Sequence, residues 1–232
     1  MATIDSENLK AQNNYWKSRW DSNEIAWHRS AYHPALVKHW PQLAKRSRVL
    51  VPLCGKTHDM IWLAEQGLQV FGVELVQVAV EQFFSDFGLN YHSHYSGNYQ
   101  HFQCVELSIH IIVGDFFKLT KEDIPFDSNN SEFDALYDRA ALVALPDTMR
   151  QEYAQQCLNL LKNNYSGLLI TFDYLQSEMQ GPPYAVLTDE LNDLYLNEFR
   201  EVERFDLLVE GSPFYEKGFS SFAEVTWLKS SQ

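Results

Sequence analysis

Arg139 is the side chain of this sequence best suited to hold an anion, and an acid, Asp138, directly precedes it. Both follow the apolar run at 133–137, which is typical of a buried strand. A guanidinium offers a planar fork of donors that can bind a carboxylate or orient an anionic reactant. We therefore predict that Arg139 and Asp138 are catalytic residues and that Arg139 also contacts a bound ligand. A structural ion pair between the two is the alternative.

A second candidate site combines Gly55 with Glu74, 19 residues further along the chain. Gly55 follows an apolar run at 48–53, and Glu74 stands at the end of another. A carboxylate at this spacing can accept hydrogen bonds from both hydroxyls of a ribose. A glycine in the first turn lets the backbone approach a ligand closely. A plain strand-to-helix turn and a carboxylate that caps a helix are the alternatives.

The turn at Gly55 does not match the glycine-rich loops that bind phosphate. A P-loop needs another glycine five residues earlier, where this chain has Leu50. A dinucleotide fingerprint needs three glycines, and only one is present. A nucleoside without a pyrophosphate remains, because such a ligand needs no nest of backbone N–H groups.

Asp115 and Phe116 follow a third apolar run, at 107–113. A polar group at Asp115 could meet the edge of an adenine ring, and Phe116 could stack on its face. The alternative is a turn that carries a core phenylalanine.

These candidates meet only if the elements that hold them form one sheet. Strands are expected at 48–53, 70–75, 107–113, 133–137 and 168–174, alternating with helices at 57–67, 76–87 and 147–161. The alternation predicts an α/β fold with a mostly parallel sheet and helices on both faces. Ligands of such sheets bind outside the carboxyl ends of the strands, where all these residues stand.

The flanking segments complete the expected fold. Helices are expected at 8–20, from 34 onward and at 188–199, with a closing antiparallel pair at 202–208 and 224–228. The segment 91–103 has no clear period and is expected to be a loop or a weak hairpin. We predict one domain over residues 1–232, in which residues 1–45 form a helical cover over the active site.

Charge and cysteine content narrow the class of partner. Acidic residues outnumber basic ones by 31 to 18, and the net charge of −13 repels nucleic acids and anionic lipid surfaces. The three cysteines form no CxxC pair, which predicts free thiols in a reducing compartment. No run has the length of a membrane span, and no residue set has metal-ligand spacing. We predict a cytoplasmic monomer that acts on a small molecule, with no metal, nucleic-acid or membrane partner.

Several of these segments, in order and over nearly the whole chain, resemble the thiopurine S-methyltransferase family. They are YW at 15–16, RW at 19–20, WH at 27–28, VPLCGK at 51–56, GVEL at 72–75, GDFF at 114–117, YDRAALVAL at 137–145 and GPP at 181–183. The resemblance implies a Rossmann-like class I methyltransferase fold with a seven-stranded sheet and S-adenosylmethionine as cofactor. The predicted cofactor contacts are then Trp16, Trp20, Leu53, Gly55, Glu74, Asp115, Phe116 and Arg139. Trp27, where the family usually has phenylalanine, and Pro182 are the predicted substrate contacts.

The resemblance also implies methyl transfer to the sulfur of a small, thiopurine-like thiol, with selenium and tellurium species as further candidate acceptors. Another small nucleophile, such as a halide or thiocyanate, and a non-catalytic protein that binds the cofactor are the alternatives. Enzymes that methylate base amines carry Asp or Asn before Pro-Pro-aromatic, where this chain has Gly181, so base methylation is not expected. Transfer from a sulfonium is expected to need alignment more than acid–base chemistry, with Arg139 favouring a thiolate.

Overall fold

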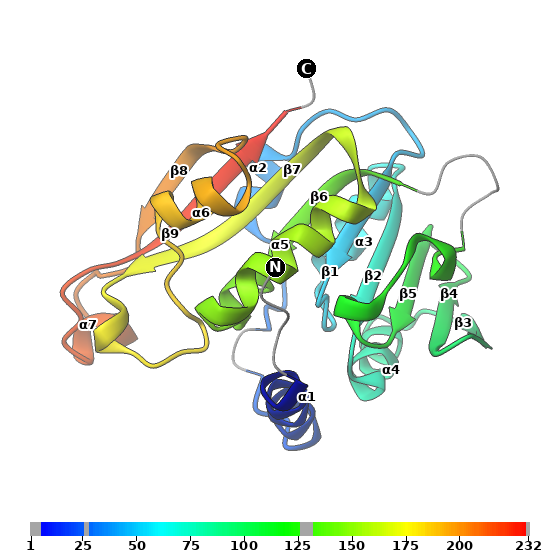
Figure 1. The fold of residues 1–232 in the computed structure, drawn as a ribbon, viewed down its shortest axis with the longest axis horizontal. Coiled ribbons are helices and arrows are strands. Elements are labelled where there is room, and N and C mark those ends of the chain that lie inside the picture. Colours follow the sequence, from blue (N-terminus) through cyan, green and yellow to red (C-terminus); the bar gives the residue numbers. More distant parts are fainter. Residues whose placement is uncertain (1–5, 26–27, 126–131, 231–232) are drawn as a thin grey trace.

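The computed structural model describes residues 6–25, 28–125 and 132–230. Within these residues, one sheet of nine strands in the order β3-β4-β5-β2-β1-β6-β7-β9-β8 forms the centre of the molecule (Figure 1). The strands are β1 Arg48–Pro52, β2 Gln69–Glu74, β3 Tyr91–Ser96, β4 Tyr99–Cys104, β5 Ile109–Val113, β6 Phe133–Arg139, β7 Leu161–Tyr174, β8 Arg200–Asp206 and β9 Phe222–Lys229.

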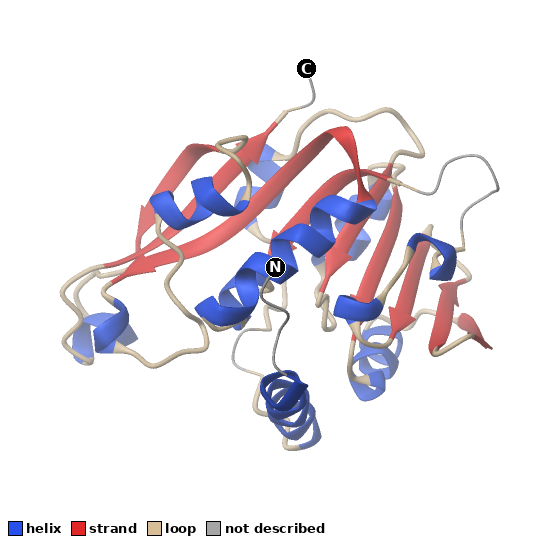
Figure 2. Ribbon diagram, viewed as in Figure 1, coloured by secondary structure: helices blue, strands red, loops and turns tan. Residues whose placement is uncertain are grey.

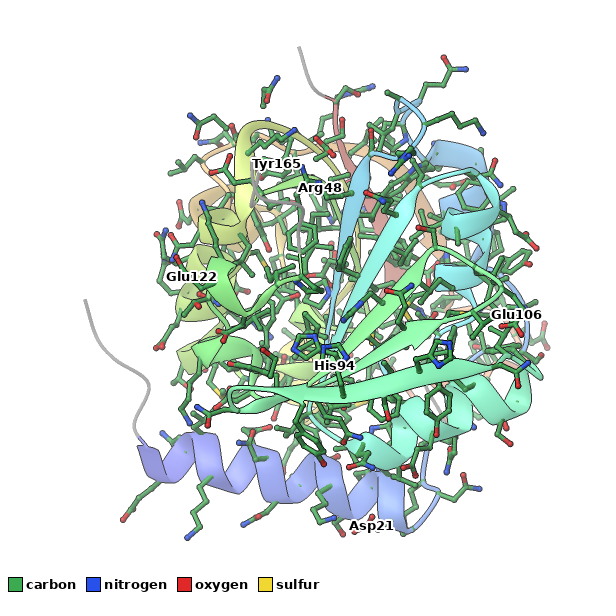
Figure 3. The ribbon with its side chains drawn as sticks, turned by 90° about the vertical axis from the view of Figure 1, so that its right-hand side faces the viewer. Asp21, Arg48, His94, Glu106, Glu122 and Tyr165 are labelled. Carbon is green, nitrogen blue, oxygen red and sulfur yellow. The ribbon has the colours of Figure 1, made fainter. Side chains whose placement is uncertain are left out.

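The five central strands, β5-β2-β1-β6-β7, pair in parallel, as the alternation of elements predicted. The closing antiparallel pair is also confirmed, because β8 and β9 pair in that sense and β9 joins the sheet at β7. In Figure 3, Arg48 at the start of β1 lies near the top and Asp21 at the end of helix α1 (Ser6–Asp21) lies at the bottom. The parallel strands therefore run toward α1, and their carboxyl ends face it.

The sheet has nine strands rather than the seven expected. The two additional strands are β3 and β4, a hairpin that pairs antiparallel to β5 along one edge. Every residue of β3 is exposed, so this strand lacks the alternation of buried and exposed positions that reveals a strand in a sequence. For this reason the hydrophobic pattern does not distinguish a loop from a hairpin in this segment.

Helices cover both faces of the sheet (Figure 2). Besides α1 they are α2 Pro34–His39, α3 Asp59–Glu65, α4 Gln77–Asp86, α5 Asp147–Leu160, α6 Thr188–Leu194 and α7 Pro213–Glu216. Successive residues of a strand point to opposite faces. Leu50 accordingly packs in the core beneath α5 and α6, while Val49 and Val51 pack in the core beneath α2, α3 and α4. No helix among the described residues combines the length and the apolarity needed to cross a bilayer.

Two element boundaries differ most from those expected. Helix α6 ends at Leu194 instead of near 199, because Leu196 and Asn197 adopt positive φ angles of 55° and 59° that a right-handed helix cannot continue. Strand β7 begins at Leu161 instead of 168. Its early positions at 162–164 are polar, and this hides the first part of the strand from the hydrophobic pattern.

Candidate active site

A cavity of about 1070 Å³ lies between the carboxyl edge of the parallel strands and α1. The predicted site residues on its lining are Trp16, Trp20, Leu53, Gly55, Glu74, Asp115, Phe116, Arg139 and Pro182. Asp138 is not on the lining, and Trp27 lies outside the described residues. The fold thus brings nearly all the predicted residues to one cavity, whose size suits a cofactor together with a small second ligand.

The turn after β1 brings the backbone against α1. Leu53 and Gly55 have positive φ angles of 46° and 52°, and for a leucine this conformation costs on the order of 1–3 kcal/mol. A Cβ atom on Gly55 would lie 3.0 Å from the Trp20 ring. Both the φ angle and this contact therefore require glycine at position 55. The Trp20 side chain, which is 4% exposed, closes this end of the cavity.

Glu74, at the end of β2, ties the β1 turn to the start of α4. Its Oε2 accepts from the Gly55 N–H at 2.8 Å, and its Oε1 accepts from the Val76 N–H at 2.8 Å. Burial raises the pKa of Glu74, and these backbone donors oppose that rise. Each carboxylate oxygen has a further lone pair, so Glu74 can also accept two hydrogen bonds from a ligand in the cavity.

Asp115 and Phe116 follow β5 and begin a short 3-10 helix, Phe116–Lys118. Asp115 Oδ1 accepts from the Phe117 N–H at 3.1 Å, and Oδ2 lies 2.9 Å from the Lys118 ammonium. Phe116 is 2% exposed and packs on Tyr153, with ring centroids 5.5 Å apart. Phe116 is therefore a core residue that also borders the cavity. Its position is compatible both with the core phenylalanine and with the ligand contact that the sequence left open.

Arg139 and Asp138, at the end of β6, point to different surroundings. Arg139 lines the cavity, whereas Asp138 is 1% exposed and accepts from the Leu142 N–H at 3.1 Å and from the Tyr153 hydroxyl at 2.8 Å. Burial raises the pKa of Asp138 to about 6. Within the described chain no ion pair joins Asp138 to Arg139. The alternative of a structural ion pair is therefore wrong.

The fold is shared with S-adenosylmethionine-dependent methyltransferases of known structure. The 1,6-didemethyltoxoflavin-N1-methyltransferase of Burkholderia thailandensis, solved with bound S-adenosylhomocysteine, superposes with a TM-score of 0.61 at 15% identity, over 100% of this chain and 93% of that one. An arsenic(III) S-adenosylmethionine methyltransferase of Chlamydomonas reinhardtii gives 0.54 at 13% identity, over 87% of this chain and 71% of that one.

Sequence comparison decides the family. The profile described as thiopurine S-methyltransferase matches residues 11–231. The chain belongs to the thiopurine S-methyltransferase family. The thiopurine S-methyltransferase of Nitrosospira multiformis is 42% identical over 218 residues, 92% of this chain and 96% of that protein. That of Pseudomonas fluorescens is 42% identical over 226 residues, 95% of this chain and 98% of that protein. The chain is thus a methyltransferase that uses S-adenosylmethionine.

The residues of the cavity fit this cofactor. The Nε of Arg19 is buried on the lining and has no hydrogen-bond partner among the described residues, so it is available to a ligand carboxylate. Glu74 retains lone pairs that a ribose could use, and Trp16 and Trp20 place aromatic side chains on the lining that suit a positively charged sulfur. The amino-acid, sugar and sulfonium parts of the cofactor thus each have a matching group.

A further carboxylate on the lining, Glu224 of β9, was not included among the residues predicted from the sequence. Its Oε2 lies 3.3 Å from Nε2 of the buried His33, whose backbone N–H donates to Asp59 at 2.7 Å. Burial favours a higher pKa for Glu224, but the hydrogen bond from His33 and the charges of His33, Arg29 and Arg139 outweigh it and lower the pKa. Glu224 is therefore held as an anion.

His28 is another lining residue that no prediction included. Its backbone N–H donates to the Ile25 carbonyl at 2.9 Å, which fixes the chain at this point. Lys56, also on the lining, forms an ion pair of 2.8 Å with Asp86. In the sequence, His28 stands out only through the WH segment of the family resemblance, and the fold then places it on the lining.

The cysteines and the possible metal ligands were the other side chains that the sequence analysis singled out. Cys54, Cys104 and Cys157 are free and buried, as expected of reduced thiols. Across the described ranges, no group of three or more His, Cys, Asp or Glu side chains is arranged to hold a metal ion. On the hairpin side of the sheet, His101 Nδ1 and His110 Nε2 bond each other at 2.9 Å.

Proposed function

We propose that this protein transfers the methyl group of S-adenosylmethionine to the sulfur of a small thiol, of which a thiopurine is one example. The observation that carries the proposal is that Gly55, Glu74 and Arg139 line one cavity at the sheet edge where this fold binds ligands. Membership of the thiopurine S-methyltransferase family supports a thiol as the acceptor.

The half of the cavity at β1 and β2 is assigned to the cofactor. When bound, S-adenosylmethionine supplies a methyl group on a positively charged sulfur, which a nucleophile displaces in line. Glu74 accepts from the ribose, and the Gly55 turn permits close approach of the backbone. The ring faces of Trp16 and Trp20 stabilise positive charge by about 0.5–2 kcal/mol each. The remaining proposed contacts are Leu53, Asp115, Phe116 and Arg139.

The acceptor half is assigned to Arg139, Pro182 and Trp27. The Arg139 guanidinium favours an ionised sulfur next to the methyl group, because it places a fixed positive charge on the cavity wall. Asp138 serves catalysis by positioning, since its carboxyl holds the loop that follows β6 through the Leu142 N–H and the Tyr153 hydroxyl. Its proposed role is to fix the direction in which Arg139 points.

The chain is proposed to work as one methyltransferase domain with residues 1–45 as a cover, which α1 supports through the lining residues it contributes. Three free thiols support a reducing, cytoplasmic location. The net charge of −13 disfavours a nucleic-acid partner. A monomeric state is also proposed, and light scattering on the purified protein tests it.

Family membership favours a thiol over the halide, thiocyanate and non-catalytic alternatives. Calorimetry with S-adenosylhomocysteine, followed by turnover with a thiopurine, selenite, tellurite, iodide and thiocyanate, tests the assignment. We expect binding and an S-methylated product, with no product from iodide or thiocyanate. Binding without product from any acceptor would indicate a cofactor-binding protein, and no binding at millimolar ligand would contradict the whole assignment.

Arg139→Ala tests the catalytic assignment within the same assay. We expect turnover to fall at least about 100-fold, since a fixed charge at the reacting group is removed. Arg200→Ala, at the exposed start of β8, is the matched control and should leave turnover unchanged. Wild-type turnover in Arg139→Ala would remove this residue from the mechanism.

A further inference from the structure

Methylation of a neutral thiol releases a proton, and the structure must offer a group that takes it. The sulfur loses its hydrogen as the new carbon–sulfur bond forms. An ordinary thiol has a pKa near 8.5, so most of it is protonated at neutral pH. Lysine, arginine and tyrosine side chains as classes hold their own protons at this pH and cannot serve as the base.

The carboxylates on the lining are already occupied. Glu74 accepts from two backbone N–H groups, and its remaining lone pairs are assigned to the cofactor ribose; Asp115 accepts from the Phe117 N–H and pairs with Lys118. Glu224 is bonded to His33, and its lowered pKa makes it a weak base. None of these groups is well placed to gain a proton from a substrate.

Besides His28, two further acid–base groups line the cavity, Cys54 and Glu203, and neither can serve as the base. Burial raises the pKa of the Cys54 thiol well above its usual value, so it stays protonated. The Glu203 carboxylate forms hydrogen bonds with the Lys38 ammonium and with His39 Nε2, and these hydrogen bonds lower the pKa of Glu203. Among the lining residues that the structure describes, His28 is what remains.

The surroundings of His28 favour a neutral imidazole with a free lone pair. No hydrogen bond to its ring is formed within the described chain. Burial lowers the pKa of His28, and the charges of Lys56, Arg139 and His58 lower it further, while Asp86 opposes them. The same positive charges that keep His28 neutral would also expel a proton from it after each turnover.

We propose that the His28 imidazole accepts the proton of the acceptor thiol while Arg139 stabilises the negative charge that develops on sulfur. This inference rests on the proposed function. The S–H bond breaks toward an imidazole nitrogen, and the sulfur electron pair forms the bond to the methyl carbon. The bond from that carbon to the sulfonium breaks, and its electron pair stays on the departing sulfur, which becomes neutral. The imidazolium then returns its proton to water.

Two acceptors that differ in ionisation separate a base from a structural residue. One is 4-nitrothiophenol, which is ionised at pH 7, and the other is benzyl mercaptan, which is protonated there. We expect His28→Gln to lower kcat/KM for benzyl mercaptan by about 100-fold or more, the usual effect of a general base, and for 4-nitrothiophenol by less than about threefold. His92→Gln, on the exposed strand β3, is the matched control and should change neither value.

The pH profile and two measurements without turnover complete the test. With benzyl mercaptan, kcat/KM of the wild type should rise with pH and level off near neutral pH. For His28→Gln, kcat/KM should keep rising above neutral pH as the thiol itself ionises. NMR of the histidine rings, with the His28 signal identified by its loss in His28→Gln, should give a midpoint below the ordinary value of 6.5. Calorimetry should show unchanged binding of S-adenosylhomocysteine by the variant.

Several results would overturn the proposal. Equal losses for both thiols, or no loss for either, would show that His28 takes no proton. A midpoint well above neutral pH would leave the imidazole protonated and would exclude it as the base. If His28→Gln still methylates 4-nitrothiophenol, the proposed function stands even when the role of His28 as a base is excluded. A wild type that methylates neither these two thiols nor a thiopurine would end the proposed function and this inference together.

Discussion

The Glu74 carboxylate orders the backbone around it and also lines the ligand cavity. It accepts from the backbone of the β1 turn and of the α4 start, and it faces the cavity from the end of β2. A group that orders the turn and also binds the ligand keeps the ligand site rigid before binding, and such preorganisation reduces the entropy lost when the ligand arrives.

Glu74→Gln should weaken binding of S-adenosylhomocysteine by about 10- to 100-fold, because the amide has one acceptor oxygen where the carboxylate has two and carries no charge. Calorimetry measures the change. Glu81→Gln, on the exposed side of α4, is the control and should bind as the wild type does. Unaltered affinity in Glu74→Gln would exclude the proposed ribose contact.

Asp138 should make folding stability depend on pH. Its pKa in the folded protein, about 6, lies above the value in the unfolded chain. The stability linked to its protonated form is therefore complete below about pH 4 and is lost as the pH rises through about 6. Asp138→Asn cannot titrate, so the unfolding free energy of the wild type relative to this variant should fall by about 2.5 kcal/mol between pH 4 and 7.

Urea unfolding at the two pH values measures this difference. Asp193→Asn, at an exposed position of α6, should show no such change relative to the wild type. A difference that is the same at both pH values would mean that the buried carboxyl of Asp138 is not raised in pKa.

At the scale of single residues, the sequence predicted the groups that follow a strand directly. The sequence was sufficient to predict Gly55, Glu74 and Arg139, because the end of an apolar run marks the ligand edge of a parallel sheet. The sequence did not predict Glu224 and His33, since their contact joins positions 191 residues apart and neither residue belongs to a recognisable local pattern. The surroundings of Asp138 were likewise missed, because its partner Tyr153 lies on another element.

At the scale of elements, the β1 turn and α1 depend on each other. The turn requires a left-handed conformation at Gly55, and the Trp20 ring fills the space where a side chain would be. Gly88 provides a direct comparison, because it has a similar φ of 62° but no other atom within 4 Å of the position that a Cβ would take.

Gly55→Ala and Gly88→Ala should therefore differ. Both carry the cost of a left-handed alanine, about 1–2 kcal/mol of unfolding free energy. Only Gly55→Ala also displaces Trp20, so it alone should lose affinity for S-adenosylhomocysteine, by at least about 10-fold, or 1.4 kcal/mol. Equal affinities in the two variants would show that the contact between the turn and α1 does not shape the ligand site.

Element prediction succeeded where burial is regular and failed where it is not. The five parallel strands are buried and apolar, so they were recognised together with the helices between them. Strand β3 is exposed throughout and the start of β7 is polar, and a hydrophobic pattern cannot detect either.

At the scale of the whole molecule, the cavity gathers residues from α1 to β9 around one sheet edge. The alternation of strands and helices made this edge predictable as a location, whereas for residues 91–103 the sequence left a loop and a weak hairpin open, and the structure has the hairpin. The hairpin lies at the sheet edge beside β5, and it reaches the ligand edge at one point, because the Tyr99 hydroxyl of β4 donates to the Asp115 carbonyl at 3.2 Å.

A ligand that joins α1 to the sheet edge should stabilise the whole fold. At about 100 times its Kd, S-adenosylhomocysteine should add about 2.7 kcal/mol to the unfolding free energy. For a chain of 232 residues this corresponds to a rise in Tm of roughly 5–10 °C. Thermal unfolding followed by circular dichroism measures it. A Tm that does not move at saturating ligand would mean that the folded state does not bind it.

The most direct test of the central claim is a crystal structure of the protein with S-adenosylhomocysteine. We expect the ligand in the cavity between α1 and the carboxyl ends of β1, β2 and β6, with both ribose hydroxyls donating to Glu74 and the departing sulfur facing Arg139. A ligand bound elsewhere, or one whose ribose makes no contact with Glu74, would contradict the account.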